Sequence, residues 1–182
     1  MERLTARLRA WEIATGQYGY VGVPEAVEAG IPNIELAKLA ARGRLRHVAY
    51  GLYRMDEMPA TPLDQYYEAV RRVGGDAHLT GESVLAIHGL ALVNPPRVHV
   101  GTARRVRARI PDWMTVVRED VPAEELEEFE GIPITTVARA IRACMATVMR
   151  ERLLDAVADA GRRGLLGPGD AQRLRREVRA RS

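Results

Sequence analysis

The chain has 182 residues, of which 47% are hydrophobic and 28% charged, values that fit a folded globular protein with one full-sized domain or two small ones. No apolar run approaches the roughly 18 residues that span a bilayer, and the first residues, MERLTARLRAWE, carry charge where a signal peptide has a hydrophobic core. The single cysteine, Cys144, excludes an internal disulfide, and its place among apolar residues at helical spacing predicts a buried structural thiol. We therefore expect a cytoplasmic protein without a membrane partner.

The net charge is only +3, but the charges are unevenly distributed. Residues 97–118 hold six arginines and one acid, Asp112, whereas residues 119–130 hold seven acids and no basic residue. Arginine suits phosphate contacts because its planar group donates two parallel hydrogen bonds. The acidic run could dock to a basic partner, but we favour the reading that it offsets neighbouring arginines within the same fold, namely Arg104, Arg105, Arg107 and Arg109.

The first sixty residues predict three short helices and a tight turn. Apolar residues recur with helical spacing from Arg3 to Thr15, and Pro24 suits the first position of a second helix. A turn at residues 30–32 follows, after which Asn33 can cap a third helix that ends at Gly43. Two short helices joined across a glycine-containing turn are typical of a helix-turn-helix.

A β-hairpin is predicted directly after these helices. The segments RLRHV (44–48) and LYRM (52–55) have the composition of strands, and the loop Ala49-Tyr50-Gly51 between them has a length typical of hairpins. Helices followed by a hairpin predict a winged helix-turn-helix DNA-binding domain over residues 1–58. In this arrangement the second helix of the motif enters the major groove and the hairpin lies along the neighbouring backbone or minor groove.

The predicted helix and hairpin carry an uncompensated charge in the sequence. Five basic residues lie between Leu36 and Met55, and no acidic residue lies there, so we expect a bound polyanion to relieve their repulsion. Residues near the helix start are candidates for base edges and the arginines for phosphates; His47 fits a half-buried hairpin residue equally well. A solvated surface or a protein-binding module are the alternatives. The candidate DNA-binding residues are Asn33, Ile34, Lys38, Arg42, Arg44, Arg46, His47, Tyr50 and Arg54.

Residues 60–182 predict an α+β domain that ends in an arginine-rich helix. The segment TPLDQYYEAVRRV (61–73) is a well-marked helix, and a short helix follows from Thr80 to His88. Three strand regions come next, at 97–101, 114–119 and 128–136, before helices at about 137–147 and 149–164 and a last one after Asp170. We expect a small, mostly antiparallel sheet with helices packed against it.

No catalytic or metal-binding arrangement stands out in this region. Ser83 and His88 lie five residues apart, so on a helix they diverge rather than meet. His78 and Glu82 could share a metal at i, i+4, but no third ligand with convincing spacing stands nearby. We therefore expect no catalytic residue, no metal and no cofactor. A remote alternative is a metal-dependent or nucleic-acid-processing enzyme centred on His78, Glu82 and His88.

Three segments carry a family likeness in the same order along the chain. Residues 30–55, GIPNIELAKLAARGRLRHVAYGLYRM, contribute Gly43, Leu45, Val48, Gly51, Tyr53 and Arg54. Residues 78–90, HLTGESVLAIHGL, contribute Ser83, Leu85, His88, Gly89 and Leu90, and residues 131–141, GIPITTVARAI, contribute Gly131, Pro133, Thr135, Thr136 and Arg139. The succession resembles the AbiEi-type antitoxins of type IV toxin–antitoxin systems. Ala140 and Arg142 depart from the family pattern, which has threonine and often aspartate there.

The resemblance implies a bacterial DNA-binding antitoxin and transcription repressor. Such a protein binds inverted repeats in the promoter of its own toxin–antitoxin operon and antagonises a nucleotidyltransferase toxin. Two-fold repeats need only two bound copies, so we expect a monomer or weak dimer. The alternative is a protein-binding antitoxin that neutralises its toxin by direct contact through residues 60–182.

Overall fold

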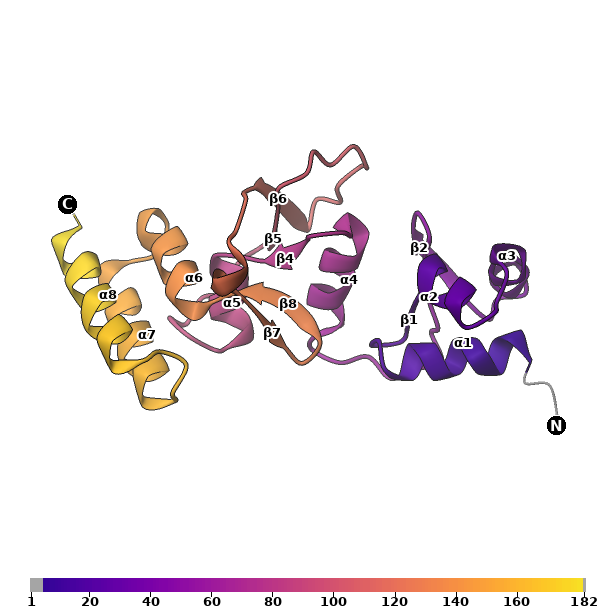
Figure 1. Ribbon diagram of the computed structural model, residues 1–182, viewed down its shortest axis with the longest axis horizontal. Helices are drawn as coiled ribbons and strands as arrows, with labels where there is room; N and C mark the ends of the chain where they lie inside the picture. Colours follow the sequence, from indigo (N-terminus) through magenta and orange to yellow (C-terminus); the bar gives the residue numbers. More distant parts are fainter. Residues whose placement is uncertain (1–4, 182) are drawn as a thin grey trace. The chain divides into compact units, whose positions relative to one another are not determined.

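A computed structural model of the protein describes residues 5–181 (Figure 1). This part of the chain contains eight α-helices and two small β-sheets, which confirms the expected mixture of helix and strand. The chain divides into two compact units, Met1–Arg72 and Val73–Ser182. Arg3, Leu4 and Ser182, which were predicted as the ends of terminal helices, lie outside the described residues. None of the described helices combines the length and the apolar character needed to cross a bilayer.

In the first unit, three helices precede a β-hairpin (Figure 1). The helices are α1 (Ala6–Thr15), α2 (Val23–Glu28) and α3 (Asn33–Ala41), and the hairpin strands are β2 (Arg46–Ala49) and β3 (Leu52–Arg54). A further strand, β1 (Tyr20–Gly22), pairs with β3 to give an antiparallel sheet of order β1-β3-β2. The predicted helices and hairpin are thus confirmed. β1 was not predicted, because its glycine-rich stretch reads as an irregular break.

The residues around α3 fix its two ends. Pro32 rather than Asn33 precedes the helix, and its carbonyl accepts a hydrogen bond from the Glu35 amide at 2.9 Å, so the prediction that Asn33 caps the helix is wrong. Proline's fixed φ suits this entry, and Asn33 is the first helical residue. At the other end Gly43 has φ +68°, and the Arg44 amide donates to the Leu39 carbonyl at 2.9 Å, a left-handed C-terminal cap.

The hydrophobic core of the first unit combines alanines with larger apolar side chains. Ala10 and Ala14 of α1 are fully buried, which lets the helix backbone approach its neighbours closely. Leu36 and Leu39 place one face of α3 in this core, leaving the opposite face of the helix in solvent. The buried residues of this core are Ala10, Ala14, Val21, Ala26, Ile31, Leu36, Leu39, Leu45, Tyr53 and Met55.

The first unit also includes nearly all of α4 (Asp64–Val73), so it extends past residues 1–58 of the predicted winged helix-turn-helix. Polar contacts attach this helix to the preceding elements. The Tyr20 hydroxyl donates to Glu68 at 2.6 Å, and Arg71 pairs with Glu25 at 2.5 Å. These partners lie more than forty residues apart in the sequence, so local patterns do not reveal the attachment.

The second unit places a five-stranded sheet among helices. Its strands are β4 (His78–Leu79), β5 (Val98–Thr102), β6 (Met114–Arg118), β7 (Leu126–Phe129) and β8 (Ile132–Thr135). The helices are α5 (Glu82–Ile87), α6 (Val137–Ala143), α7 (Arg150–Arg162) and α8 (Pro168–Ala180), with short 3₁₀ turns at Ala123–Glu125 and Cys144–Ala146. α7 and α8 lie side by side (Figure 1). α8 begins at Pro168, two residues before the predicted cap Asp170.

The sheet of the second unit is mixed, so the prediction of a mostly antiparallel sheet is wrong. The strand order is β6-β5-β4-β8-β7. β4 pairs antiparallel with β5 and β7 with β8, but β5 with β6 and β4 with β8 are parallel. β4 lies at the centre of the order yet has only two residues, which is too short to show the alternation that marks a strand in a sequence.

Candidate nucleic-acid interface

The outer face of α3 presents the predicted contact residues of the helix. Asn33, Ile34, Lys38 and Arg42 are all exposed, with Ile34 at 62% despite its apolar side chain. Leu36 and Leu39, on the opposite face, are buried. The apolar spacing of α3 therefore turns the four candidates together toward solvent.

The hairpin presents a second set of candidates. Tyr50, at the turn before Gly51, is fully exposed, and Gly51 supplies the positive φ of +65° that the turn requires. Arg46 and His47 are exposed at the start of β2. The His47 ring meets the edge of Tyr53 at 5.2 Å between ring centres, so the histidine packs on the hairpin yet remains exposed, and the half-buried reading of His47 is wrong.

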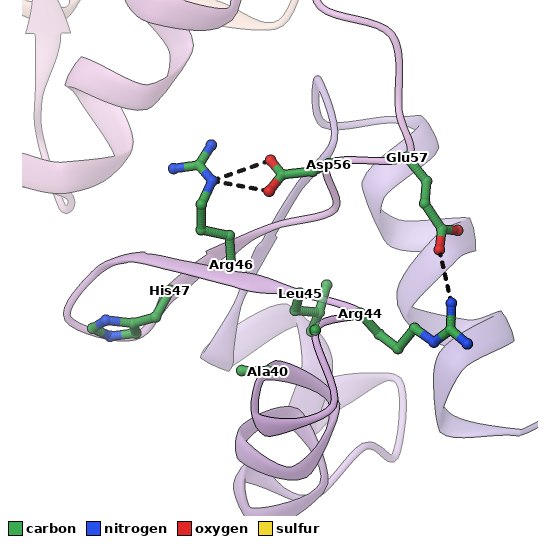
Figure 2. Close-up of a pocket in the computed structure, with 8 residues that line it drawn as sticks. Ala40, Arg44, Leu45, Arg46, His47, Asp56 and Glu57 are labelled. Carbon is green, nitrogen blue, oxygen red and sulfur yellow. Dashed lines mark hydrogen bonds and ion pairs between the residues drawn. The ribbon is translucent and has the colours of Figure 1, made fainter.

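A hollow of about 420 Å³ lies where the end of α3 meets the start of the hairpin (Figure 2). Arg44 and Arg46 lie on its two sides, and each points toward a carboxylate of the segment that follows β3 (Figure 2). The residues that line the hollow are Ala40, Gly43, Arg44, Leu45, Arg46, His47, Asp56 and Glu57.

Most of the basic residues in this surface have an acidic partner, so the expectation of uncompensated charge is wrong. Arg46 Nε donates to both oxygens of Asp56, at 3.0 and 3.2 Å, and Arg44 pairs with Glu57 at 3.5 Å. Lys38 pairs with Glu35 at 2.7 Å. These acids stand at positions 35, 56 and 57, just outside the acid-free stretch 36–55, and a slightly wider window would have revealed them.

The pairs fix the charge state of the carboxylates. The hydrogen bond from Arg46, opposed by partial burial, lowers the pKa of Asp56 below its usual range. The hydrogen bond from Arg7, at 2.7 Å, likewise lowers the pKa of Glu57. The Arg46 and Asp56 side chains are nevertheless 54% and 55% exposed. Exposed pairs of this kind contribute roughly 0–1 kcal/mol to stability, so a phosphate could displace the carboxylate at little cost.

Arg54 differs from the other candidates because it is buried. Its residue is 8% exposed, and its guanidinium donates to Asp64 at 2.7 Å and to Asp56 at 3.3 Å, 5.6 Å from the centre of the Tyr20 ring. This position inside the first unit corrects the expectation that Arg54 reaches a ligand from the base of the hairpin. Arg42, in contrast, is exposed and makes no ion pair within residues 5–181.

Histidines of the second unit are tied into the fold. His78 is buried, with Nδ1 3.0 Å from the Asp76 carbonyl and Nε2 3.3 Å from Glu119. His88 is also buried, its ring 4.8 Å from that of Phe129, and its Nε2 has no hydrogen-bond partner among the described residues. No group of three or more His, Cys, Asp or Glu side chains in residues 5–181 is placed to hold a metal. His78, Glu82 and His88 thus form no metal-holding group within these residues.

Cys144 and the acidic run at residues 119–130 were also predicted to be structural features of the second unit. Cys144 is 1% exposed, as predicted, and burial raises the pKa of its thiol to about 12, which suits an unreactive structural residue. Within residues 5–181, however, the acidic run makes no ion pair with Arg104, Arg105, Arg107 or Arg109. Glu119 and Glu125 both pair with Arg139, whereas Arg104 pairs with Asp76 at 2.9 Å.

The sequence matches no model of a known protein family and no curated protein. The likeness to AbiEi-type antitoxins therefore rests on the motif residues alone. Among these, Ser83 has a clear structural role, because its hydroxyl accepts a hydrogen bond from the His99 amide of β5 at 2.7 Å and so attaches α5 to the sheet.

Proposed function

We propose that the first unit is a winged helix-turn-helix that binds double-stranded DNA, with α3 in the major groove and the hairpin β2–β3 along the backbone. The observation that carries the proposal is the order α1-β1-α2-α3-β2-β3 together with one exposed face of α3 beside an exposed basic hairpin. Asn33, Ile34 and Lys38 would read base edges, and Arg42, Arg44 and Arg46 would contact phosphates.

On this proposal the protein is a cytoplasmic bacterial antitoxin that represses its own operon. The promoter would carry inverted repeats, each half bound by one copy, and a nucleotidyltransferase toxin would be encoded with it. The motif residues quoted above support this part of the proposal. Arg54, being buried, is left out of the proposed contact surface and holds the hairpin instead.

The test is binding of the full chain to a duplex carrying its own promoter, compared with the variant R44A/R46A. We expect the variant to bind at least about tenfold more weakly at moderate salt, because two phosphate contacts are lost. The matched control is R162A/R173A, which removes two exposed arginines that also have carboxylate partners, Asp159 and Asp170. Equal affinity of R44A/R46A and the wild-type protein would contradict the assignment of the hairpin to phosphate contacts.

A second candidate function is direct contact with the toxin through the second unit. β7 is an edge strand of the sheet, and its Glu127 and Glu128 are exposed and make no ion pair within residues 5–181. An acidic edge of this kind suits a basic protein surface. Co-purification of the chain with the toxin, abolished in E127Q/E128Q, would favour this function, and full antagonism without any complex would exclude it.

A further inference from the structure

The connection between β5 and β6 has an unusual form. The two strands are parallel neighbours, with Val98 opposite Met114 and Thr102 opposite Arg118. The chain must therefore travel back along the sheet by roughly 13 Å, four residues of strand, before β6 begins. A helix usually makes such a crossover. Here residues 103–113 make it without a helix or strand (Figure 1).

The side chains of this crossover divide by polarity. Val106 and Ile110 are partly buried, whereas Arg105, Arg107 and Arg109 are exposed. The apolar residues thus attach the segment to the body of the unit and leave the arginines in solvent. We call Arg105, Arg107 and Arg109 the basic crossover.

The start of the connection is fixed by Asp76. Its carboxylate accepts hydrogen bonds from the Thr102 hydroxyl and the Ala103 amide, each at 2.7 Å, and from Arg104 Nε at 2.9 Å. The hydrogen bond from Thr102 is the main reason that the pKa of Asp76 falls to about 2. Arg104 is thereby neutralised, but the arginines that follow it are not.

The basic crossover has no carboxylate partner in the part of the chain that the structure describes. None of its three arginines makes an ion pair or side-chain hydrogen bond with another residue of 5–181, in contrast to Arg44 and Arg46 of the hairpin. Two more exposed arginines without ion pairs in the same range flank it. Arg118 lies opposite Thr102 at the end of β6, and Arg97 immediately precedes β5. Asp112 is the one acid in residues 97–118.

We propose that the basic crossover is a second DNA-binding surface, which holds the phosphate backbone of a duplex without reading its sequence. Exposed guanidinium groups close together in the sequence repel one another, and the phosphates of a duplex relieve that repulsion with paired hydrogen bonds. The inference goes beyond the proposed function because it uses neither α3 nor the hairpin. It rests on that function only in the choice of duplex DNA as the polyanion.

The experiment measures binding of the full chain by fluorescence anisotropy to the promoter duplex and to a scrambled duplex of the same length, between about 50 and 200 mM salt. The variant R105A/R107A/R109A should bind the scrambled duplex at least about tenfold more weakly, and its log–log salt slope should shrink by about 2–3. The control R175A/R176A/R179A removes three exposed arginines of α8, so its net charge changes equally, and it should lose less than about threefold.

Several results would overturn the inference. These are an unchanged salt slope in the crossover variant, an equal loss in the α8 control, or binding of an acidic protein with no affinity for duplex. R105K/R107K/R109K keeps the charge and should keep the affinity, so a loss equal to that of the alanine variant also counts against it. The proposed function fails separately, when R44A/R46A binds the promoter as tightly as the wild-type protein does.

Discussion

Arg46 and Asp56 face each other across the hairpin, and the arginine donates through Nε to both carboxylate oxygens at 3.0 and 3.2 Å. Asp56 also accepts a hydrogen bond from the buried Arg54 at 3.3 Å, so one carboxylate connects an exposed arginine with an interior one. The exposed arginine is a proposed phosphate contact. Any phosphate that binds it must therefore compete with a carboxylate that is already in place.

This competition predicts that Asp56→Asn binds DNA more tightly than the wild-type protein. The asparagine keeps the shape of the side chain but removes the competing charge, so affinity for the promoter duplex should rise about threefold to tenfold. The slope of log affinity against log salt concentration should also become steeper. In the variant, a phosphate that binds Arg46 would release counterions instead of displacing a carboxylate. Titrations at several salt concentrations measure both effects. Weaker binding by Asp56→Asn would show that the pair positions Arg46 instead.

Substitution of Arg54 by alanine should mainly lower stability, whereas substitution of Arg46 should mainly weaken DNA binding. Arg54→Ala leaves Asp64, which is 9% exposed, without its charged partner, and this should lower the free energy of unfolding by about 3–5 kcal/mol. Arg46→Ala breaks an exposed pair and should cost less than about 1 kcal/mol while weakening DNA binding. Urea denaturation of the two variants, followed by circular dichroism, makes the comparison. Equal losses of stability would contradict the buried position of Arg54.

The sequence predicted much of the first unit because its signals are local. Gly43 and Gly51 adopt the positive φ that the helix end and the hairpin turn require, and the apolar spacing of α3 identifies its buried face. The ion pairs of the basic segment could not be predicted from that segment alone, because the carboxylates that pair with its arginines follow the hairpin. These carboxylates belong to Asp56, Glu57 and Asp64.

The second unit was harder to predict because its sheet depends on long-range pairing. Leu79 pairs with Val100 on one side and with Ile134 on the other, more than fifty residues away. A two-residue central strand leaves no periodic pattern, and strand direction follows from the route of the connections rather than from composition. His78 and Glu119 are 41 residues apart, so no local spacing in the sequence indicates their pair.

The close approach of the His78–Glu119 pair to β5 should require glycine at position 101. A Cβ atom at this position of β5 would overlap Glu119 Oε1 and His78 Nε2, and the buried histidine has little room to move. Gly101→Ala should therefore lower the free energy of unfolding by about 1–3 kcal/mol. Gly169→Ala in α8 is the matched control. Apart from its chain neighbours and the helix backbone, an added methyl there meets no atom of residues 5–181 within 4 Å, so the stability of this variant should be unchanged or slightly higher. Thermal unfolding of both variants decides; an undisturbed Gly101→Ala would refute the close packing.

His78 and His88 should give stability opposite dependences on pH. Burial disfavours protonation of His78, but its hydrogen bonds to Glu119 and to the Asp76 carbonyl outweigh this and raise its pKa above 6.5. The stability it contributes is thus complete below pH 6.5 and is lost as pH rises through the raised pKa. Burial, followed by the charge of Arg163, lowers the pKa of His88. Its contribution is therefore complete above pH 6.5 and is lost as pH falls through the lowered pKa.

Single substitutions should separate these two contributions. Glu119→Gln removes the charge that holds the proton on His78. The stability of this variant should therefore rise with pH between about 5 and 8, which is the trend expected from His88. His88→Phe keeps a ring against Phe129 and removes the unpartnered Nε2, so its stability should fall with pH over the same range. Glu119 itself titrates far below this window, because the hydrogen bond from His78 and others from Thr80 and Arg139 lower its pKa to about 2. Urea midpoints at several pH values would test the argument, and parallel profiles for the two variants would contradict it.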